Sequence, residues 1–455
     1  MRIFETIVIL LGVVIMLLSM LKVKSYRRTT YVLLGLFLLL NMITEGLRYE
    51  VLSMILAITI IGIPTLSFIR IRRIFSMVIF IIMLSLIFIF PIYQMPTPTG
   101  SYDIGTKVYQ INDTTRSEIY GDTDTFRKFN VQIWFPFEKT NETERAPWLL
   151  DQEVTSQALS RDFGFPGFLL NQTQYVQSNS YLDADFTEEK TYPIVILSHG
   201  WSGTKYLHSD LGEMFASEGF IAVSIEHTYG SVASVIDNEV IFKQDDALTA
   251  FKDDQLGLES NTRLMMTYGL DVIATIDYLE LLNNDPADIF YQHLDLNHIG
   301  AVGHSTGGGG VIYASLMEQR IKAIIGLDAW VEPIREILEM DSLNVPSLFL
   351  RSEAWEEGPN NDVLLQMIDA STKDTSLYRI KGTTHYDFAM VYMYTSLAKP
   401  IGFSGSIETH TMIDIMFSSH LSYFNEHLKN NNNDIIIICY TSINVSAAWL
   451  ITVPS

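Results

Sequence analysis

Four long apolar stretches open the chain, at Ile3–Leu21, Thr30–Ile43, Val51–Ile69 and Phe75–Tyr93, each separated from the next by a short charged turn. A helix needs about 20 apolar residues to cross the hydrocarbon core of a membrane. The pattern therefore predicts four transmembrane helices within residues 1–95, of which the second is short unless its flanks are included. A cleaved signal peptide would account for the first stretch alone, and nothing after that stretch resembles a small-residue cleavage site.

Beyond residue 125 the chain changes to short apolar runs separated by longer segments of mixed character. Short buried runs that alternate with helical segments are typical of a mostly parallel sheet with helices on both faces. The expected strands are Phe129–Phe135, Tyr192–Leu197, His298–Val302, Ile321–Leu327, Ser347–Leu350 and Ser376–Ile380. We also expect a helix over Gln244–Tyr268 packed before Leu270–Leu282, and loops with short helices over Lys139–Glu189 that would cover part of a site.

The composition of the remaining segments predicts the domain boundaries. Residues 96–125 are rich in Pro, Thr, Gly and polar residues, which indicates a juxtamembrane linker between the transmembrane region, 1–95, and a catalytic domain, 126–430. Residues 431–455 form an apolar C-terminal tail that contains the run Ile435–Val453. Polar residues within that run leave two interpretations open, a fifth span and an added tail without function.

The most informative local pattern is Gly303-His304-Ser305-Thr306-Gly307. It follows the strand-like run His298–Val302 and leads into Gly308-Gly309-Gly310-Val311, which predicts a strand, a sharp turn and a helix with a serine at the apex. Such a turn strains its central residue and exposes the serine hydroxyl at the start of a helix, where the helix dipole favours negative charge. Ser305 is therefore the candidate nucleophile.

The candidate acid and base follow in the order serine, acid, histidine, which is the order found in α/β-hydrolases. Asp328 stands directly after the run Ile321–Leu327, at the sheet edge where open α/β sheets carry their chemistry. His385 lies on the loop after the last expected strand, where the general base of such an enzyme belongs. Asp387 and Glu332 are rival acids, although the first is too near His385 in sequence to be the usual strand-end acid and the second lies further into the loop after Asp328.

The loop Ser198–Gly203, which follows the run Tyr192–Leu197, is expected to bind a developing oxyanion. In this fold the amide after His-Gly and the amide of the residue after the nucleophile both point at the carbonyl oxygen. These two amides belong to Trp201 and Thr306. An ordinary glycine turn would have the same sequence, and only the coupling of this loop to Ser305 favours the catalytic interpretation.

Taken together, the motifs resemble the plasma-type platelet-activating factor acetylhydrolases and their bacterial relatives, over roughly Gln132 to Leu428. The matching pieces are Ser198-His199-Gly200, Ser224-Ile225-Glu226-His227, Gly303-His304-Ser305-Thr306-Gly307-Gly308, Gly326-Leu327-Asp328-Ala329-Trp330, Arg351-Ser352-Glu353 and Gly382-Thr383-Thr384-His385-Tyr386-Asp387-Phe388-Ala389. The spacings from Ser305 to Asp328 and from Asp328 to His385 also look like those of the family. The resemblance implies an α/β-hydrolase that cleaves short or oxidised sn-2 acyl esters of phospholipids through a Ser305–His385–Asp328 triad, with no metal. Thr306, where the mammalian enzymes carry a bulkier aromatic residue, and the apolar N-terminal region depart from the mammalian pattern.

Charge is distributed unevenly between the two parts of the chain. Residues 1–95 hold nine Lys and Arg against three Asp and Glu, a net +6, so the remainder carries −28 within a total of −22. Such an acidic domain argues against nucleic-acid binding and favours a neutral or zwitterionic substrate. The basic loops are Lys22–Arg28 and Arg70–Arg73. The positive-inside rule places both loops in the cytoplasm and the catalytic domain on the extracytoplasmic side of the cell membrane.

The remaining composition bears on cofactors and on the class of enzyme. The single cysteine, Cys439, excludes an intramolecular disulfide framework and a cysteine-rich metal site, and we expect no cofactor and no metal. The sequence thus predicts a membrane-anchored serine esterase whose partners are a small ester substrate, such as a phospholipid, and the membrane itself. A general carboxylesterase, a lipase or a polyester hydrolase would use the same site. A peptidase or amidase and a non-catalytic receptor of the same fold are further alternatives, and acyl length and oligomeric state stay open.

Overall fold

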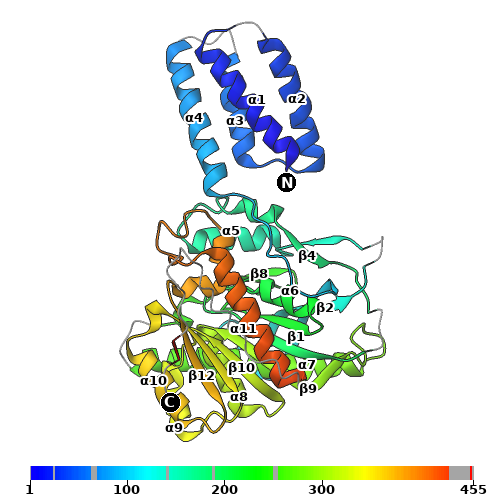
Figure 1. The fold of residues 1–455 in the computed structure, drawn as a ribbon, viewed down its shortest axis with the longest axis vertical. Coiled ribbons are helices and arrows are strands. Elements are labelled where there is room, and N and C mark those ends of the chain that lie inside the picture. Colours follow the sequence, from blue (N-terminus) through cyan, green and yellow to red (C-terminus); the bar gives the residue numbers. More distant parts are fainter. Residues whose placement is uncertain are drawn as a thin grey trace. The chain divides into compact units, whose positions relative to one another are not determined.

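The computed structural model describes residues 2–23, 26–62, 69–139, 143–186, 190–249, 255–429 and 451–452 of the chain (Figure 1). The chain divides into two compact units, Met1–Pro91 and Ile92–Ser455, and each unit has its own hydrophobic core.

The first unit consists of four helices, which are α1 (Ile3–Met20), α2 (Arg27–Thr44), α3 (Tyr49–Gly62) and α4 (Ile69–Ile89). Its core is made of side chains from all four helices, among them Val8, Ile15, Leu34, Met54, Ile58 and Phe80. Large apolar side chains also cover the outward faces, among them Leu10, Val32, Leu36, Leu56, Ile71, Phe75 and Phe88. Helices that are apolar on every face are found in membrane spans or in the core of large proteins.

The length of these helices corrects the prediction of four spans. Two helices, Ile3–Met20 and Arg70–Ile89, are long and apolar enough to cross a membrane, with mean hydropathies of 2.6 and 2.2, whereas Arg28–Thr44 and Tyr49–Ile61 are shorter. The third predicted span was to reach Ile69, but α3 ends at Gly62, two residues before Pro64, and the residue before a proline disfavours helical backbone. Core helices of soluble proteins and signal sequences pass the same length test, so two such helices are weak evidence of a membrane anchor.

Buried ion pairs lie at the end of the first unit where α1 and α3 begin and where α2 ends. The Arg48 guanidinium lies 2.7 Å from the Glu50 carboxylate and 3.6 Å from that of Glu5, and all three side chains are buried. The Glu45 carboxylate accepts hydrogen bonds from the amides of Phe4 and Glu5 at 2.9 and 2.8 Å, and so caps the positive end of the α1 dipole.

A single mixed sheet forms the centre of the second unit. Its strands, from one edge to the other, run in the order β13-β12-β11-β10-β9-β5-β6-β2-β1-β4-β3. From β12 to β6 all neighbours are parallel, and β2 is antiparallel to β6 and to β1. The main strands are β1 (Asp103–Ser117), β2 (Phe126–Phe137), β5 (Tyr192–Ser198), β6 (Ile221–Glu226), β9 (Leu294–His304), β10 (Ile321–Leu327), β11 (Ser347–Ser352) and β12 (Thr375–Ile380). Each expected strand is thus confirmed, with small changes at its ends.

Helices cover both faces of the sheet, as expected. One face packs against α7 (Gln255–Asn284), α8 (Thr306–Met317), α9 (Arg335–Met340) and α10 (Pro359–Ala370). The other face packs against α6 (Ser209–Ser217) and α11 (Thr409–Lys429), and α11 crosses it in Figure 1. This arrangement confirms the α/β-hydrolase fold, in which the carboxyl ends of the parallel strands share one edge.

Two predicted segments differ from the observed elements. The segment 96–125, interpreted as a linker, contains β1, whose polar side chains resemble a loop although it pairs with β2 from Asp103 to Ser117. The helix expected at 244–268 begins at Gln255 and continues through Gly269 to Asn284 as one helix, α7, which includes the segment 270–282. A Cβ on this glycine would lie 2.6 Å from the Tyr313 ring and 2.7 Å from the Gly310 carbonyl oxygen, so Gly269 permits close packing on α8 and does not break α7.

The remaining short elements lie between these strands and helices. The polar segment 139–189 holds β3 (Arg145–Pro147), α5 (Gln152–Asp162) and β4 (Gln177–Tyr181), and a hairpin of β7 (Ala233–Ile236) and β8 (Glu239–Phe242) follows β6. Most of the predicted tail, 431–455, and of the candidate fifth span, Ile435–Val453, lies outside the described residues. The exception is β13 (Ile451–Thr452), which pairs antiparallel with β12.

Candidate active site

Ser305 occupies a strained turn between β9 and α8. Its backbone has φ 56° and ψ −120°, a conformation that residues other than glycine rarely adopt. The Ser305 amide donates to the Leu327 carbonyl at 3.0 Å, and the Ser305 carbonyl accepts from the Trp330 amide at 2.9 Å. The turn is therefore tied on both sides to the end of β10, and Ser305 is half-buried among buried neighbours.

Glycines beside Ser305 allow the main chain to pack at this distance. A Cβ on Gly303 would lie 2.2 Å from the Gly307 carbonyl oxygen, and a Cβ on Gly307 would lie 2.3 Å from the Ser198 carbonyl oxygen. No side chain fits at either position, because backbone atoms cannot move aside as the end of a flexible side chain can. The glycines of the sequence pattern thus follow from the geometry of the turn.

Asp328 and His385 are joined directly. The Asp328 carboxylate lies at the end of β10, buried, and its Oδ2 accepts from His385 Nδ1 at 3.1 Å. It also accepts two hydrogen bonds from Ser352, at 2.7 Å from the amide and 2.5 Å from the hydroxyl. Because Nδ1 of His385 carries the proton that faces the carboxylate, Nε2 is left as the basic nitrogen of the ring.

Ser305 lies near this pair, because His304, its neighbour in sequence, packs against His385. The rings of His304 and His385 lie 4.5 Å apart, and His304 Nε2 donates to the His385 carbonyl at 3.0 Å. Among the described residues no hydrogen bond joins the Ser305 hydroxyl to His385; such contacts are often long in enzymes without substrate. Burial first, and then repulsion by His385, hold the pKa of His304 well below its ordinary value, so His304 stays neutral beside a ring that would become charged.

The two rival acids lie elsewhere. The Asp387 carboxylate accepts from the Thr384 amide at 2.7 Å, from the Gly405 amide at 2.8 Å and from the Ser404 hydroxyl, and it thereby holds the loop that carries His385. Glu332 begins a 3₁₀ turn after β10, and among the described residues it makes no hydrogen bond or ion pair with His385. Asp328 is therefore the acid that touches the histidine.

The two amides expected to bind an oxyanion are unpaired. Neither the Trp201 amide nor the Thr306 amide donates a hydrogen bond within the part of the chain that the structure describes. Thr306 is the first residue of α8, where helical amides have no partner of their own. A Cβ on Gly200 would lie 2.9 Å from Cβ of Ser305, so the loop that carries Trp201 passes directly beside the serine.

Sequence reasoning assigned no role to two residues at this site. Ser352, which ends β11, donates both hydrogen bonds to Asp328, and the Trp355 ring stacks on His385 with centroids 4.3 Å apart and planes 3° apart. The sequence did carry a signal for Ser352, because this serine ends the buried strand β11, and β11 lies next to β10, the strand that Asp328 follows. No local signal marked Trp355, because its position depends on how the loop after β11 folds back.

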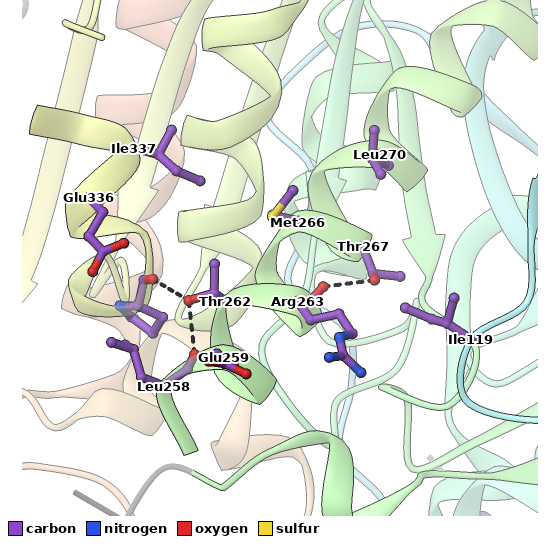
Figure 2. A pocket seen from close by; sticks show the side chains of 11 residues that line it. Ile119, Leu258, Glu259, Thr262, Arg263, Met266, Thr267, Leu270, Glu336 and Ile337 are labelled. Atoms are coloured by element: carbon purple, nitrogen blue, oxygen red, sulfur yellow. Dashed lines mark hydrogen bonds between the residues drawn. The ribbon is translucent and has the colours of Figure 1, made fainter. Parts of the chain in front are cut away.

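One pocket lies along α7 (Figure 2). It has a volume of about 490 Å³ and does not include Ser305, Asp328 or His385. Its walls are one face of α7 together with Ile119 and the turn after β10, and the Thr262 hydroxyl links α7 to the Pro333 carbonyl at 2.5 Å. Within the described residues no group of three or more His, Cys, Asp or Glu side chains could hold a metal ion.

Comparison with known sequences identifies the family. The sequence model described as "Platelet-activating factor acetylhydrolase, isoform II" matches residues 88–255 and 277–436. The chain belongs to this family. Membership in the platelet-activating factor acetylhydrolase family makes it a carboxylic ester hydrolase, and confirms the resemblance drawn from the sequence motifs.

Individual relatives agree with this assignment. The platelet-activating factor acetylhydrolases of Cavia porcellus and Bos taurus are 23% and 27% identical to the chain, cover 74% of it and are themselves covered over 79% and 77% of their length. A cutinase of Thermobifida fusca is 25% identical and covers 44% of the chain and 51% of its own length. The solved structure of a ferulic acid esterase from Streptomyces cinnamoneus has the same fold, with a TM-score of 0.60, 19% identity and coverage of 76% of this chain and 96% of the esterase.

The contacts of Ser352 with Asp328 lead to a prediction. Ser352→Ala removes one charge-assisted hydrogen bond from a buried carboxylate, and such a bond contributes about 1.5–3 kcal/mol. We expect kcat for p-nitrophenyl butyrate to fall by about tenfold to 10²-fold. The matched control is Ser347→Ala, because Ser347 is buried at the other end of β11 and its hydroxyl donates to the Val345 carbonyl at 2.8 Å. Equal kcat values for the two variants would contradict a role for Ser352 in holding Asp328.

Proposed function

We propose that the chain is a membrane-anchored serine esterase that uses Ser305 as nucleophile, His385 as general base and Asp328 as its orienting acid. The observation that carries the proposal is the hydrogen bond from His385 to the buried Asp328, beside a serine held at a strained turn. Strain of this kind persists only where the surrounding structure imposes it, and it is concentrated at functional sites.

The chemistry follows from this arrangement. His385 takes the proton of the Ser305 hydroxyl as the oxygen attacks the ester carbonyl, and Asp328 stabilises the imidazolium that forms. The oxyanion of the tetrahedral intermediate is held by the Trp201 and Thr306 amides. His385 returns the proton to the leaving alcohol, and a water molecule, activated by the same histidine, then hydrolyses the acyl-enzyme and frees Ser305.

The substrate that family membership favours is a phospholipid with a short or oxidised sn-2 acyl chain. The residues beyond position 95 carry a net charge of −28, which disfavours anionic substrates and suits a zwitterionic headgroup. A general carboxylesterase is the second candidate, because the chain is similar in sequence to a cutinase and shares its fold with a ferulic acid esterase.

The apolar N-terminal unit supports attachment to a membrane. Its outward faces carry large apolar side chains that water would not favour, and α1 and α4 have the length of a span. Lys22–Arg28 and Arg70–Arg73 lie after α1 and at the start of α4, and the positive-inside rule places both in the cytoplasm. The chain from Ile92 onward would then lie outside, and α2 and α3, being short, would pack against the two spans.

The role of Ser305 is tested by substitution. Because the three triad residues act as a unit, Ser305→Ala should remove nearly all esterase activity while the fold is kept. A fluorophosphonate probe should label the parent chain and leave the variant unlabelled. Activity above a few per cent of the parent level, with the variant folded, would refute Ser305 as the nucleophile.

The substrate is tested by comparing acyl chains. In the presence of a chelator we expect acetyl sn-2 phosphatidylcholine to be hydrolysed faster than the palmitoyl lipid, with p-nitrophenyl butyrate as a simple ester for reference. Equal or faster turnover of the palmitoyl lipid would contradict the chain-length preference. Activity confined to the simple ester would make the enzyme a general carboxylesterase.

The orientation is tested with protease added to intact cells. If the basic loops are cytoplasmic, protease should release or degrade the hydrolase unit without permeabilisation. Digestion that occurs only after permeabilisation would reverse the proposed orientation. The distribution of Ser305 labelling by a probe that does not cross membranes provides an independent measurement.

A further inference from the structure

The second unit contains another Ser-His-Asp set, separate from Ser305, Asp328 and His385. His227, which follows β6, lies with Nδ1 2.9 Å from Asp271 Oδ2 and with Nε2 2.8 Å from the Ser198 hydroxyl. Ser198 ends β5, and Asp271 lies on α7. The hydrogen bonds have the same order and length as those of a hydrolytic triad.

Burial separates this set from a catalytic one. The residues Ser198, His227 and Asp271 are each 0% exposed. The Tyr268 ring stacks on His227 with centroids 3.7 Å apart and planes 19° apart, so the ring is covered. A substrate carbonyl has no path to the Ser198 oxygen, whereas Ser305 is half-buried and the His385 side chain is 18% exposed.

Two arginines fix the charge of Asp271. The Arg127 guanidinium donates to both Asp271 oxygens at 3.1 and 2.7 Å, and Arg116 donates to Oδ1 at 2.8 Å. Burial alone would raise the pKa of Asp271, but the two arginines hold it well below its usual range. Burial lowers the pKa of His227 despite the aspartate, so the ring is neutral, donates from Nδ1 and accepts at Nε2.

The same set of residues is continuous with the loop that carries Trp201. Ser198 is followed directly by His199, whose Nδ1 donates to the Gly200 carbonyl at 2.7 Å and whose Nε2 accepts from the Ser231 hydroxyl at 2.9 Å. Main-chain hydrogen bonds join the two loops again, from Ser202 to Gly230 and from Val232 to Gly203, both at 2.9 Å.

The loop after His227 is itself fixed to the sheet. Arg127, on β2, donates from Nη1 to the Thr228 carbonyl at 3.0 Å while its other nitrogens hold Asp271. One guanidinium therefore connects β2, α7 and the loop after β6, and His227 extends the connection to the end of β5. The Trp201 amide lies three residues beyond that end.

We propose that Ser198, His227 and Asp271 are positioning residues that hold the oxyanion loop, so that the Trp201 amide is set in place before an ester binds. The inference rests on the proposed function of the Trp201 amide. An amide that binds an oxyanion must be fixed in advance, because its contribution depends on not having to reorient during the reaction. Its displacement should weaken binding of the transition state and leave binding of the ester ground state largely unchanged.

The test compares Ser198→Ala with Ser224→Ala in the full chain. Ser224 lies on the adjacent strand β6, is equally buried and has a hydroxyl with no partner among the described residues, so its variant loses the same atom without breaking the set. We expect Ser198→Ala to lower kcat for p-nitrophenyl butyrate by about tenfold to 10²-fold at an unchanged KM. Affinity for a trifluoromethyl ketone, which forms a tetrahedral oxyanion on Ser305, should fall by the same factor. Ser224→Ala should match the parent in both.

A second variant, His227→Phe, keeps the ring on Tyr268 and removes both hydrogen bonds, and it should reproduce the loss seen in Ser198→Ala. Parental kcat and ketone affinity in Ser198→Ala, or a change confined to KM, would overturn the proposal. Fluorophosphonate labelling of Ser198 in the Ser305→Ala variant would also overturn it, because Ser198 would then be a nucleophile. If the proposed function were wrong, the Ser305→Ala variant would keep its esterase activity. That result would distinguish failure of the proposed function from failure of the positioning role.

Discussion

The close packing of main chain around Ser305 is the constraint on which the hydrolase unit depends. Backbone atoms of β5, β9, α8 and the end of β10 meet at this turn, at distances that only glycine permits at positions 303 and 307. The hydrogen bonds from Ser305 to Leu327 and from Trp330 to Ser305 make the same turn part of the strand end that carries Asp328. The serine and the acid are therefore fixed relative to one another by main chain, and the sheet order brings the histidine loop to the same edge.

Two sets of serine, histidine and aspartate with opposite surroundings lie in the second unit. Around Asp328 the charge is balanced by hydrogen bonds from Ser352 and His385, and the histidine retains some contact with solvent. Around Asp271 the charge is balanced by two arginines, and the histidine is enclosed. Under the proposed function these two sets, made of the same three residue types, have different roles, because access and the partner of the carboxylate decide whether the histidine can exchange a proton with a substrate.

The first unit follows a different physical rule. Three of its charged side chains, Glu5, Arg48 and Glu50, lie buried where α1 and α3 begin and pair with one another, while large apolar side chains cover its outward faces. An isolated charge in an apolar unit would be costly to bury, and pairing with hydrogen bonds reduces that cost. The mixture of two long and two short apolar helices suits a unit in which a pair of spans supports shorter helices between them.

Sequence alone determined the family, the fold and most strands of the central part of the sheet, because these depend on local patterns: short buried runs, glycines around a serine, and an acid directly after a strand. Chain order also led to Asp328 and His385, which the structure joins, although their catalytic roles stay a prediction. Local patterns failed where the pairing partner decides the structure. The polar residues of β1 predict a linker, but they form a strand because they pair with β2. They also assigned no role to Ser352, to Trp355 or to the Ser198–His227–Asp271 set, because residues far apart in sequence meet only when the sheet, α7 and the loops pack together.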